Sequence, residues 1–370
     1  MKTALFELLL SRYVEMNFYE SFFSLIRLGI DHSDGIVPDR LDWQFIKYNA
    51  DKQGLSAIII DGIEKLPDCK RPSKFALLEW IGEVMQNYEA RYAEYEKAIS
   101  TLAGFYNQHG YKMMVLKGYA SSLDWPNPKH RPCGDIDIWQ LGKQKEADAL
   151  LKNEKGIKID SSHHHHTVFY WGDFMVENHY DFDNVHARKS NYEIEKYLKE
   201  LGMDDSHYTE VYNEKVYLPS PDLHALFLLR HMLGHFASSN INLRQVLDWA
   251  FFVEKHTKEV DWGWLIGVLK KYHMIEFYNT INAICVGNLG FDAKIFPSVQ
   301  FHPDLKDKVL NDIFYPKYTA SEPSRLIPRL VYKYRRWQGN AWKQELCYRE
   351  SRWSAFWSGV WGHLLKPKSL

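Results

Sequence analysis

The chain has 370 residues, a formal net charge of −1 at pH 7 and 45% hydrophobic residues, among them 13 Trp, 23 Tyr and 20 Phe. This length predicts two or three packed units rather than one small core, and the aromatic content excludes disorder over most of the chain. The balanced charge argues against long nucleic acid as a partner, because a strongly basic surface is what such binding needs.

The cysteines and the start of the chain indicate where the protein works. Four cysteines lie far apart without a CxxC pair, and no cleavable signal peptide is recognisable at the start. No apolar run approaches the ~20 residues that span a bilayer. We therefore expect free thiols, no membrane span and a soluble cytoplasmic protein.

Residues 1–95 are predicted to form an N-terminal helical region. Apolar residues such as Phe22, Leu25 and Ile26 recur at helical spacing, and residues 76–104 form a long amphipathic run with glutamates on its polar side. Glycine and proline residues interrupt the pattern near Gly29 and Pro67, which predicts more than one helix.

Residues 96–219 are predicted to form the α+β core of the protein, with a mixed sheet. The pattern predicts strands at 112–116 and 134–141 and helices at 118–123 and 143–152. Two β-rich runs then flank Gly172-Asp173, which predicts a hairpin with a type II′ turn and glycine first.

Residues 220–370 are predicted to form a C-terminal helical region. Ser220-Pro221 is a typical N-cap and first-turn pair, and further helices are expected at 242–256 and 262–289. The tail from Arg325 is basic and rich in tryptophan. We expect it to pack against the rest of the chain, with RNA or an anionic membrane as alternative partners.

The pair Asp135 and Asp137 is the clearest functional signal. Side chains of a strand alternate between its faces, so these two carboxylates share one face while Ile136 and Ile138 point into a core. Paired carboxylates repel each other unless a cation lies between them, and Mg²⁺ or Mn²⁺ is the usual oxygen-bound ion. The pattern therefore predicts a metal site.

The predicted hairpin supplies a third carboxylate. With Gly172-Asp173 as the turn, Val168 pairs with Glu177, His166 with His179, and His164 with Asp181. Glu177 then lies inside the second strand, and two-metal phosphoryl chemistry needs a third carboxylate from a neighbouring strand. Glu177 is accordingly the predicted third ligand.

A phosphate-binding turn is predicted upstream of the aspartates. Lys117-Gly118 follows a strand, and a glycine there lets backbone N–H groups approach phosphate oxygens closely. Lys117 or Arg131 can neutralise the phosphate charge.

The histidines leave two readings open. His164, His166 and His179 could instead bind Zn²⁺, which would suit a zinc hydrolase. Otherwise His166 and His179, together with His231 and His235 of a later helix, are predicted to line the substrate cleft.

One further pair on the C-terminal helices has a simple interpretation. Arg244 and Asp248 are four residues apart, and this spacing predicts a salt bridge on the surface of their helix.

These motifs together resemble a known group, the uncharacterised bacterial nucleotidyltransferase family of the polymerase-β-like superfamily. The resemblance rests on Leu116-Lys117-Gly118, Arg131, Gly134 to Ile138, and Val176-Glu177-Asn178-His179. It spans roughly residues 40 to 255 and is most specific at the acidic motif.

The resemblance implies a minimal nucleotidyltransferase core with helical additions, two divalent ions at Asp135, Asp137 and Glu177, and a triphosphate on the Lys117-Gly118 turn. The superfamily has Gly-Ser at this turn. The chain has Lys117-Gly118-Tyr119 instead, so Ser121 or Ser122 would have to supply the hydroxyl contact.

The sequence as a whole predicts an Mg²⁺- or Mn²⁺-dependent nucleotidyltransferase. It would move a nucleoside monophosphate from a nucleoside triphosphate to a hydroxyl of a small molecule, sugar or protein, and release pyrophosphate. The alternatives are a relative that binds a nucleotide or a partner protein without turnover, and the zinc hydrolase.

Overall fold

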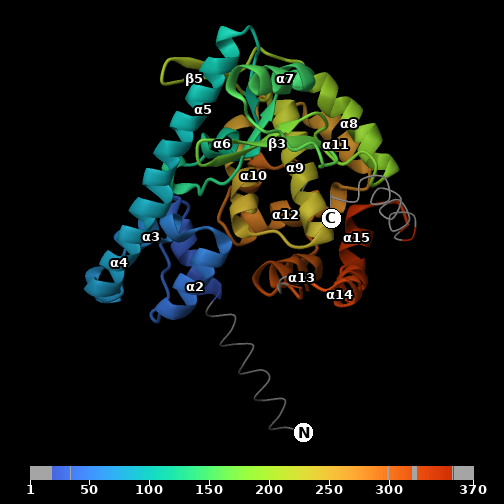
Figure 1. Cartoon of the computed structure of the whole chain (residues 1–370). Helices are drawn as coiled ribbons and strands as arrows, with labels where there is room; N and C mark the ends of the chain where they lie inside the picture. Colours follow the sequence, from blue (N-terminus) through green and yellow to red (C-terminus); the bar gives the residue numbers. More distant parts are fainter. Residues whose placement is uncertain (1–18, 34, 298–299, 319–322, 352, 354–370) are drawn as a thin grey trace.

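The computed structural model describes residues 19–33, 35–297, 300–318, 323–351 and 353 (Figure 1). Two of the tail tryptophans, Trp357 and Trp361, lie outside the described residues. No helix in the described ranges is both long enough and apolar enough to cross a bilayer. The cytoplasmic location stays a prediction.

A six-stranded mixed sheet forms the centre, as predicted for an α+β fold. Its strand order is β3-β4-β2-β1-β6-β5, with β1 parallel to β6, β2 parallel to β4, and the other neighbouring pairs antiparallel. The strands are β1 (Met114–Val115), β2 (Ile136–Trp139), β3 (His166–Trp171), β4 (Phe174–His179), β5 (Tyr208–Val211) and β6 (Glu214–Tyr217).

The predicted hairpin is confirmed. Trp171 pairs with Phe174, Val168 with Glu177 and His166 with His179. Gly172 has φ +59° whereas Asp173 does not have a positive φ, which fits the predicted type II′ turn.

The ladder ends at the His166–His179 pair, and the predicted pairing of His164 with Asp181 is wrong. The N–H groups of Tyr180 and Asp181 both donate to the carbonyl of His165, so two residues oppose one, as in a β-bulge. Residues 163–165 lie in a bend before the strand, so the alternation of side chains does not extend to them.

Each face of the sheet is covered by a different hydrophobic core. Ile136 and Ile138 are fully buried and pack with helix α5 (Arg91–Gln108) and helix α7 (Gln144–Lys155). Trp139, which alternates with them on β2, packs in the other core with α8 (Lys189–Leu201) and α9 (Pro221–Ser238). Asp137 shares this second face, so the acidic residues point toward α9.

The N-terminal helices flank one side of the sheet (Figure 1). Residues 19–29 are helical and are followed by α2 (Trp43–Gln53), α3 (Ser56–Glu64), the short η1 (Asp68–Lys70) and α4 (Lys74–Val84). A π-helical turn, η2 (Met85–Ala90), joins α4 to α5 without a break, so the helix runs on through residue 95.

The connections that carry the site follow the expected order. Helix α6 (Lys117–Ser122) starts directly after β1, and η3 (Pro128–His130) leads toward β2. Helix α8 and the β5–β6 hairpin, between β4 and α9, have no counterpart in the elements predicted from the sequence.

The C-terminal helices pack under the second face of the sheet. Ser220 caps α9 and accepts from the N–H of Leu223, as predicted, and Asn242 forms a capping box with Gln245 at α10 (Leu243–His256). The remaining elements are α11 (Trp262–Lys271), α12 (Ile275–Gly287), η4 (Ala293–Ile295), α13 (Pro303–Phe314), α14 (Leu326–Gly339) and α15 (Ala341–Cys347).

Candidate functional site

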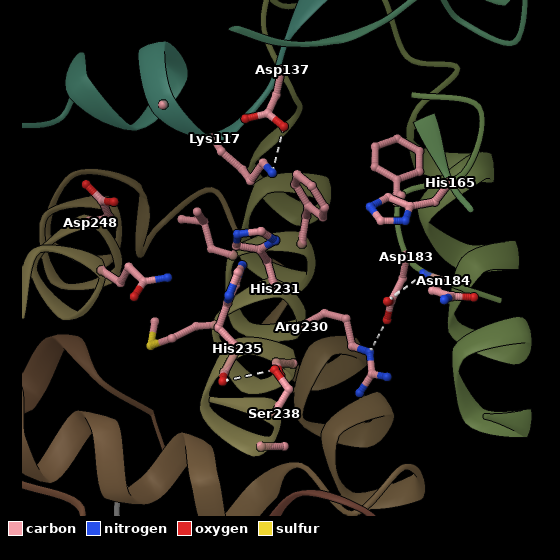
Figure 2. A pocket seen from close by; sticks show the side chains of 18 of the residues that line it. Lys117, Asp137, His165, Asp183, Asn184, Arg230, His231, His235, Ser238 and Asp248 are labelled. Carbon is pink, nitrogen blue, oxygen red and sulfur yellow. Dashed lines mark hydrogen bonds and ion pairs between the residues drawn. The ribbon is translucent and has the colours of Figure 1, made fainter. Parts of the chain in front are cut away.

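A cavity of about 900 Å³ lies between the second face of the sheet and α9. This volume falls in the range of small-molecule and cofactor sites. Figure 2 shows Lys117 and Asp137 on one side of it, and His231 and His235 projecting from α9. The predicted residues on its lining are Asp135, Asp137, Glu177, Lys117, Gly118, Arg131, His166, His231 and His235.

Strand pairing brings two of the three predicted carboxylates together. Asp137 of β2 stands opposite Glu177 of β4 in the parallel ladder. Oxygen atoms of Asp137 and Glu177 and a ring nitrogen of His179 lie within 4.8 Å of one another. Asp135 lines the same cavity but its side chain is not part of this close group.

Asp137 is nearly inaccessible to solvent, and its carboxylate contacts two side chains. Its Oδ1 lies 2.7 Å from the Lys117 Nζ and 2.9 Å from the His179 Nε2. Burial would raise the pKa of the Asp137 carboxyl, but the Lys117 ammonium and the His179 hydrogen bond outweigh burial and hold that pKa far below its usual range. Asp137 is therefore ionised at any physiological pH.

Glu177 behaves in the opposite way. Burial, followed by repulsion from Asp137, raises the pKa of the Glu177 carboxyl to about 7. The two carboxylates thus differ in proton affinity although they share one site. A group that is half protonated near neutral pH is suited to accept or release a proton.

Lys117 and Gly118 form the first residues of α6. Lys117 has φ +38°, a left-handed conformation that is rare for a residue with a side chain and is often found at functional sites. A Cβ at Gly118 would lie 2.9 Å from the Tyr95 hydroxyl, which donates to the carbonyl of Asp135 at 2.8 Å. Glycine at 118 therefore lets α5 pack close to the start of β2.

The structure does not bring Ser121 and Ser122 to the cavity. Both are buried. The Ser121 Oγ lies 3.3 Å from the His224 Nε2, and the Ser122 Oγ lies 2.8 Å from the Tyr92 hydroxyl and donates to the carbonyl of Tyr119. Neither hydroxyl could contact a phosphate in the cavity, because both point into the packed interior of the protein.

Arg131 lines the cavity, but its guanidinium forms an ion pair with Asp248. Its Nε and Nη2 donate to the two carboxylate oxygens of Asp248 at 2.7 and 2.9 Å, and the Trp125 Nε1 also donates to Asp248. The predicted helix salt bridge between Arg244 and Asp248 is therefore wrong, since this bidentate pair across 117 residues takes the carboxylate.

Arg244 lines the cavity, and its guanidinium has no counter-ion among the described residues. It forms no ion pair with any described residue, and its buried Nε has no hydrogen-bond partner. Burial, followed by repulsion from Arg131, lowers the pKa of its guanidinium. The sequence does not indicate that Arg244 lines the cavity, because Asp248, one helical turn away, is available as a salt-bridge partner.

Another part of the cavity wall is also polar, and the sequence did not predict it. The Arg230 Nε donates to Asp183 at 2.8 Å (Figure 2), and Arg188 stacks on the Tyr348 ring at 3.7 Å. This wall combines three segments that lie far apart in the sequence. The segment after β4 contributes Asp183 and Arg188, α9 contributes Arg230, and Tyr348 follows α15. No local sequence motif connects them.

The histidine run contributes two rings to the cavity, and they are His165 and His166 rather than His164 and His166. Burial, followed by repulsion from His179, lowers the pKa of each of these two imidazoles to about 3. Both rings are therefore neutral near pH 7. His164 contacts the ring of His186 and does not line the cavity.

The chemistry of the carboxylates suits a divalent cation. Two carboxylates face each other, one of them with a raised pKa, and a cation between them would offset their repulsion. The residues present therefore fit an oxygen-bound ion, with Asp137 and Glu177 as the ligands that the fold brings together and Asp135 close by on the same strand face.

The chain matches a known protein family over most of its length. A family model described as an uncharacterised nucleotidyltransferase matches residues 39–286. A crystal structure of an antigenic nucleotidyltransferase-like protein from Paracoccidioides brasiliensis is similar with 16% identity and a TM-score of 0.32, over 43% of this chain and 75% of that chain. No curated protein matches the chain.

Proposed function

The chain belongs to the uncharacterised nucleotidyltransferase family, and from this premise we propose that it transfers a nucleoside monophosphate from a nucleoside triphosphate to an acceptor hydroxyl. The observation that carries the proposal is the pairing of Asp137 with Glu177 across β2 and β4, in a cavity that also holds Lys117. We further propose that its chemistry is that of polymerase-β-like enzymes.

A divalent ion, Mg²⁺ or Mn²⁺, held by Asp135, Asp137 and Glu177 would supply charge neutralisation at the triphosphate. Lys117 lies at the N-terminus of α6, where N–H groups and a cation can hold phosphate oxygens. No carboxylate of the described residues pairs with the Arg244 guanidinium, and we assign this group to the same triphosphate. Arg131 positions the loop before β2 through Asp248.

In the proposed reaction the acceptor oxygen forms a bond to the α-phosphorus, and the bond from that phosphorus to the pyrophosphate oxygen breaks. The proton of the acceptor hydroxyl passes to the Glu177 carboxylate, which acts as the base. Pyrophosphate carries the remaining charge away. The acceptor is proposed to be a small molecule, a sugar or a protein side chain.

The test uses α-labelled and γ-labelled nucleoside triphosphates with Mg²⁺ and cell extract. Transfer of the α label alone supports the proposal, and Asp137→Asn should abolish that transfer. His164→Ala is the matched control, because His164 lies next to the site without lining the cavity. Transfer of the γ label, or transfer that survives Asp137→Asn, would overturn the proposal.

A second candidate is a relative that binds nucleotides or a partner protein without turnover. It is favoured by one observation, namely that the Lys117 ammonium and His179 both contact the Asp137 oxygen that a metal would use. Tight nucleotide binding with no label transfer to any component of the extract would support this candidate instead.

A further inference from the structure

The rings of His165, His166 and His179 form a cluster that the proposed transfer does not use. One nitrogen from each ring can be chosen so that all three lie within 4.8 Å of one another. His166 is 6% exposed, and among the described residues neither of its ring nitrogens has a hydrogen-bond partner. The buried Nδ1 of His165 has none there either. Buried polar atoms normally have a partner, so these nitrogens are available to a ligand.

Glu177 lies beside two of the three rings, with a different carboxylate oxygen near each. Its Oε1 lies 3.6 Å from the His166 Nε2, and its Oε2 lies 3.8 Å from the His179 Nε2. Two ligand atoms of a tetrahedral zinc ion are separated by about 3.3 Å, since zinc bonds to nitrogen and oxygen are about 2.0–2.1 Å long. The observed separations therefore need only small side-chain movements to close around an ion.

We propose that His165, His166 and His179 form a second cation site, bordered by Glu177, that takes Zn²⁺ in preference to Mg²⁺. Three imidazole nitrogens are an established ligand set for Zn²⁺, whereas Mg²⁺ requires oxygen ligands. The Nδ1 of His179 lies 3.1 Å from the carbonyl of Asp181, a contact that orients this ring as such contacts do at metal sites. His165 points into the cavity in Figure 2.

Zinc binding at this site does not depend on nucleotidyl transfer. One consequence does rest on the proposed function: because His179 of the zinc site also contacts Asp137, Zn²⁺ should weaken the Mg²⁺-dependent binding of a nucleotide. If Zn²⁺ binds as described but no nucleotide binds at all, the proposed function fails while the zinc site stands.

The full-length chain, freed of metal with a chelator, is titrated with Zn²⁺ in excess Mg²⁺ by calorimetry. Co²⁺ then serves as a spectroscopic probe, because a tetrahedral site gives intense visible absorption. We expect one Zn²⁺ per chain and a tetrahedral Co²⁺ spectrum. His165→Ala and His166→Gln should each weaken Zn²⁺ binding at least about tenfold, and circular dichroism checks that both variants are folded.

His164→Ala is the matched control, since His164 belongs to the same run but not to the cluster, and it should bind Zn²⁺ as the parent does. Equal weakening by His164→Ala would mean that the run binds metal as a flexible tag, and would overturn the proposal. So would the absence of stoichiometric binding, or binding that is lost in Asp137→Asn and kept in His166→Gln.

Discussion

Glu177 and Asp137 line the same cavity, but the charge of Glu177 should lower the stability of the folded protein whereas the charge of Asp137 should raise it. Glu177 is buried beside a like charge, so its ionised form costs free energy in the folded protein. We expect Glu177→Gln to raise the melting temperature of the metal-free protein at pH 8, while it abolishes transfer. Thermal unfolding without metal measures the first effect, and a lower melting temperature would mean that Glu177 is a structural residue.

Asp137 should behave differently because it neutralises a buried cation. Removal of its charge by Asp137→Asn leaves the Lys117 ammonium unpaired. Breaking a fully buried pair costs about 3–5 kcal/mol, and the cavity next to Lys117 reduces this to roughly 1–3 kcal/mol. Urea unfolding measures the loss. The matched change Asp135→Asn, at a carboxylate without an ion pair among the described residues, should be close to neutral.

Two of the arginines that line the cavity, Arg244 and Arg131, should differ in whether they support nucleotide binding or folding. We expect Arg244→Gln to weaken nucleotide binding about tenfold or more and to leave unfolding free energy nearly unchanged, because Arg244 forms no ion pair with a described residue. Arg131→Gln should lower stability instead, since it removes the bidentate partner of Asp248. Nucleotide titration and urea unfolding on both variants test this contrast, and equal losses of stability would contradict it.

Residue positions on one strand were predictable from the sequence, whereas partners across the fold were not. The alternation along β2 and the glycine turn of the β3–β4 hairpin are local properties, and they place Asp137 and Glu177 within their own strands. The parallel pairing of β2 with β4 that sets these carboxylates opposite each other is not local. The pairing of Arg131 with Asp248 joins a loop to a helix 117 residues later. Nothing local to Asp248 distinguishes this partner from Arg244, which is nearer in sequence.

At the scale of elements, the contact between α5 and the start of β2 sets the position of the acidic strand. Gly118→Ala should force the Tyr95 hydroxyl away from the carbonyl of Asp135, because the new Cβ would lie 2.9 Å from that hydroxyl. We expect a loss of about 1–2 kcal/mol, typical of one buried hydrogen bond, together with weaker nucleotide binding. Gly134→Ala is the control, since its Cβ would meet no atom within 4 Å.

Helix α8 holds the segment after β4 through a carboxylate with a raised pKa. Glu195 accepts from the N–H groups of Phe182 and Asp183, and Lys199 and Asp181 are its charged neighbours. Burial raises the pKa of Glu195 to about 8. The folded state therefore binds this proton more tightly than the unfolded state does.

This sign predicts how stability depends on pH. The contribution of Glu195 is fully present below pH ~4, near the unfolded pKa, and falls as pH rises toward about 8. Glu195→Gln cannot ionise, so this variant should lose less stability between pH 5 and pH 8 than the parent chain. Urea unfolding across that range measures the slope, and parallel curves for the two proteins would contradict the prediction.

The elements differ in how plainly the sequence marks them. The β3–β4 hairpin has a Gly-Asp turn between β-rich runs, but the turn of the β5–β6 hairpin is Tyr212-Asn213, with φ +48° and +67°. No glycine marks that turn, so this hairpin is hard to recognise. Helix α8 has buried residues Ile194 and Leu198 at i, i+4 spacing, a periodic signal from which it could have been found.

On the scale of the whole molecule, the chain beyond the matched family region closes one wall of the cavity. The family match ends at residue 286, yet Gln344 of α15 and Tyr348 line the cavity. Polar side chains of α15 and the residue before it donate to the last carbonyls of α9: Asn340 to Ser238, Lys343 to Ser239 and Gln344 to Ala237. The expected packing of the tail against the rest of the chain is thus confirmed for α15.

Lys343 is the residue that joins these helices. Its side chain is almost fully buried, its Nζ pairs with Asp312 of α13, and it donates to the carbonyl of Ser239 at 2.7 Å. Lys343→Met leaves the Asp312 carboxylate buried without its partner, and we expect it to cost about 3 kcal/mol. Because α15 carries the wall of the cavity, the same change should also reduce the stabilisation that a bound nucleotide gives.

The double variant Lys343→Met with Asp312→Leu distinguishes the contribution of the Lys343–Asp312 ion pair from that of the Lys343 hydrogen bond to α9. Replacing both charges by apolar groups removes the unpaired carboxylate, so most of the stability should return. The contact of Lys343 with the end of α9 is still lost, and the recovery should therefore be incomplete. Urea unfolding of the parent, both single variants and the double variant gives the coupling energy. A coupling near zero would mean that α15 is held by its apolar contacts, such as that of Trp342 with Phe236, rather than by the Lys343–Asp312 pair.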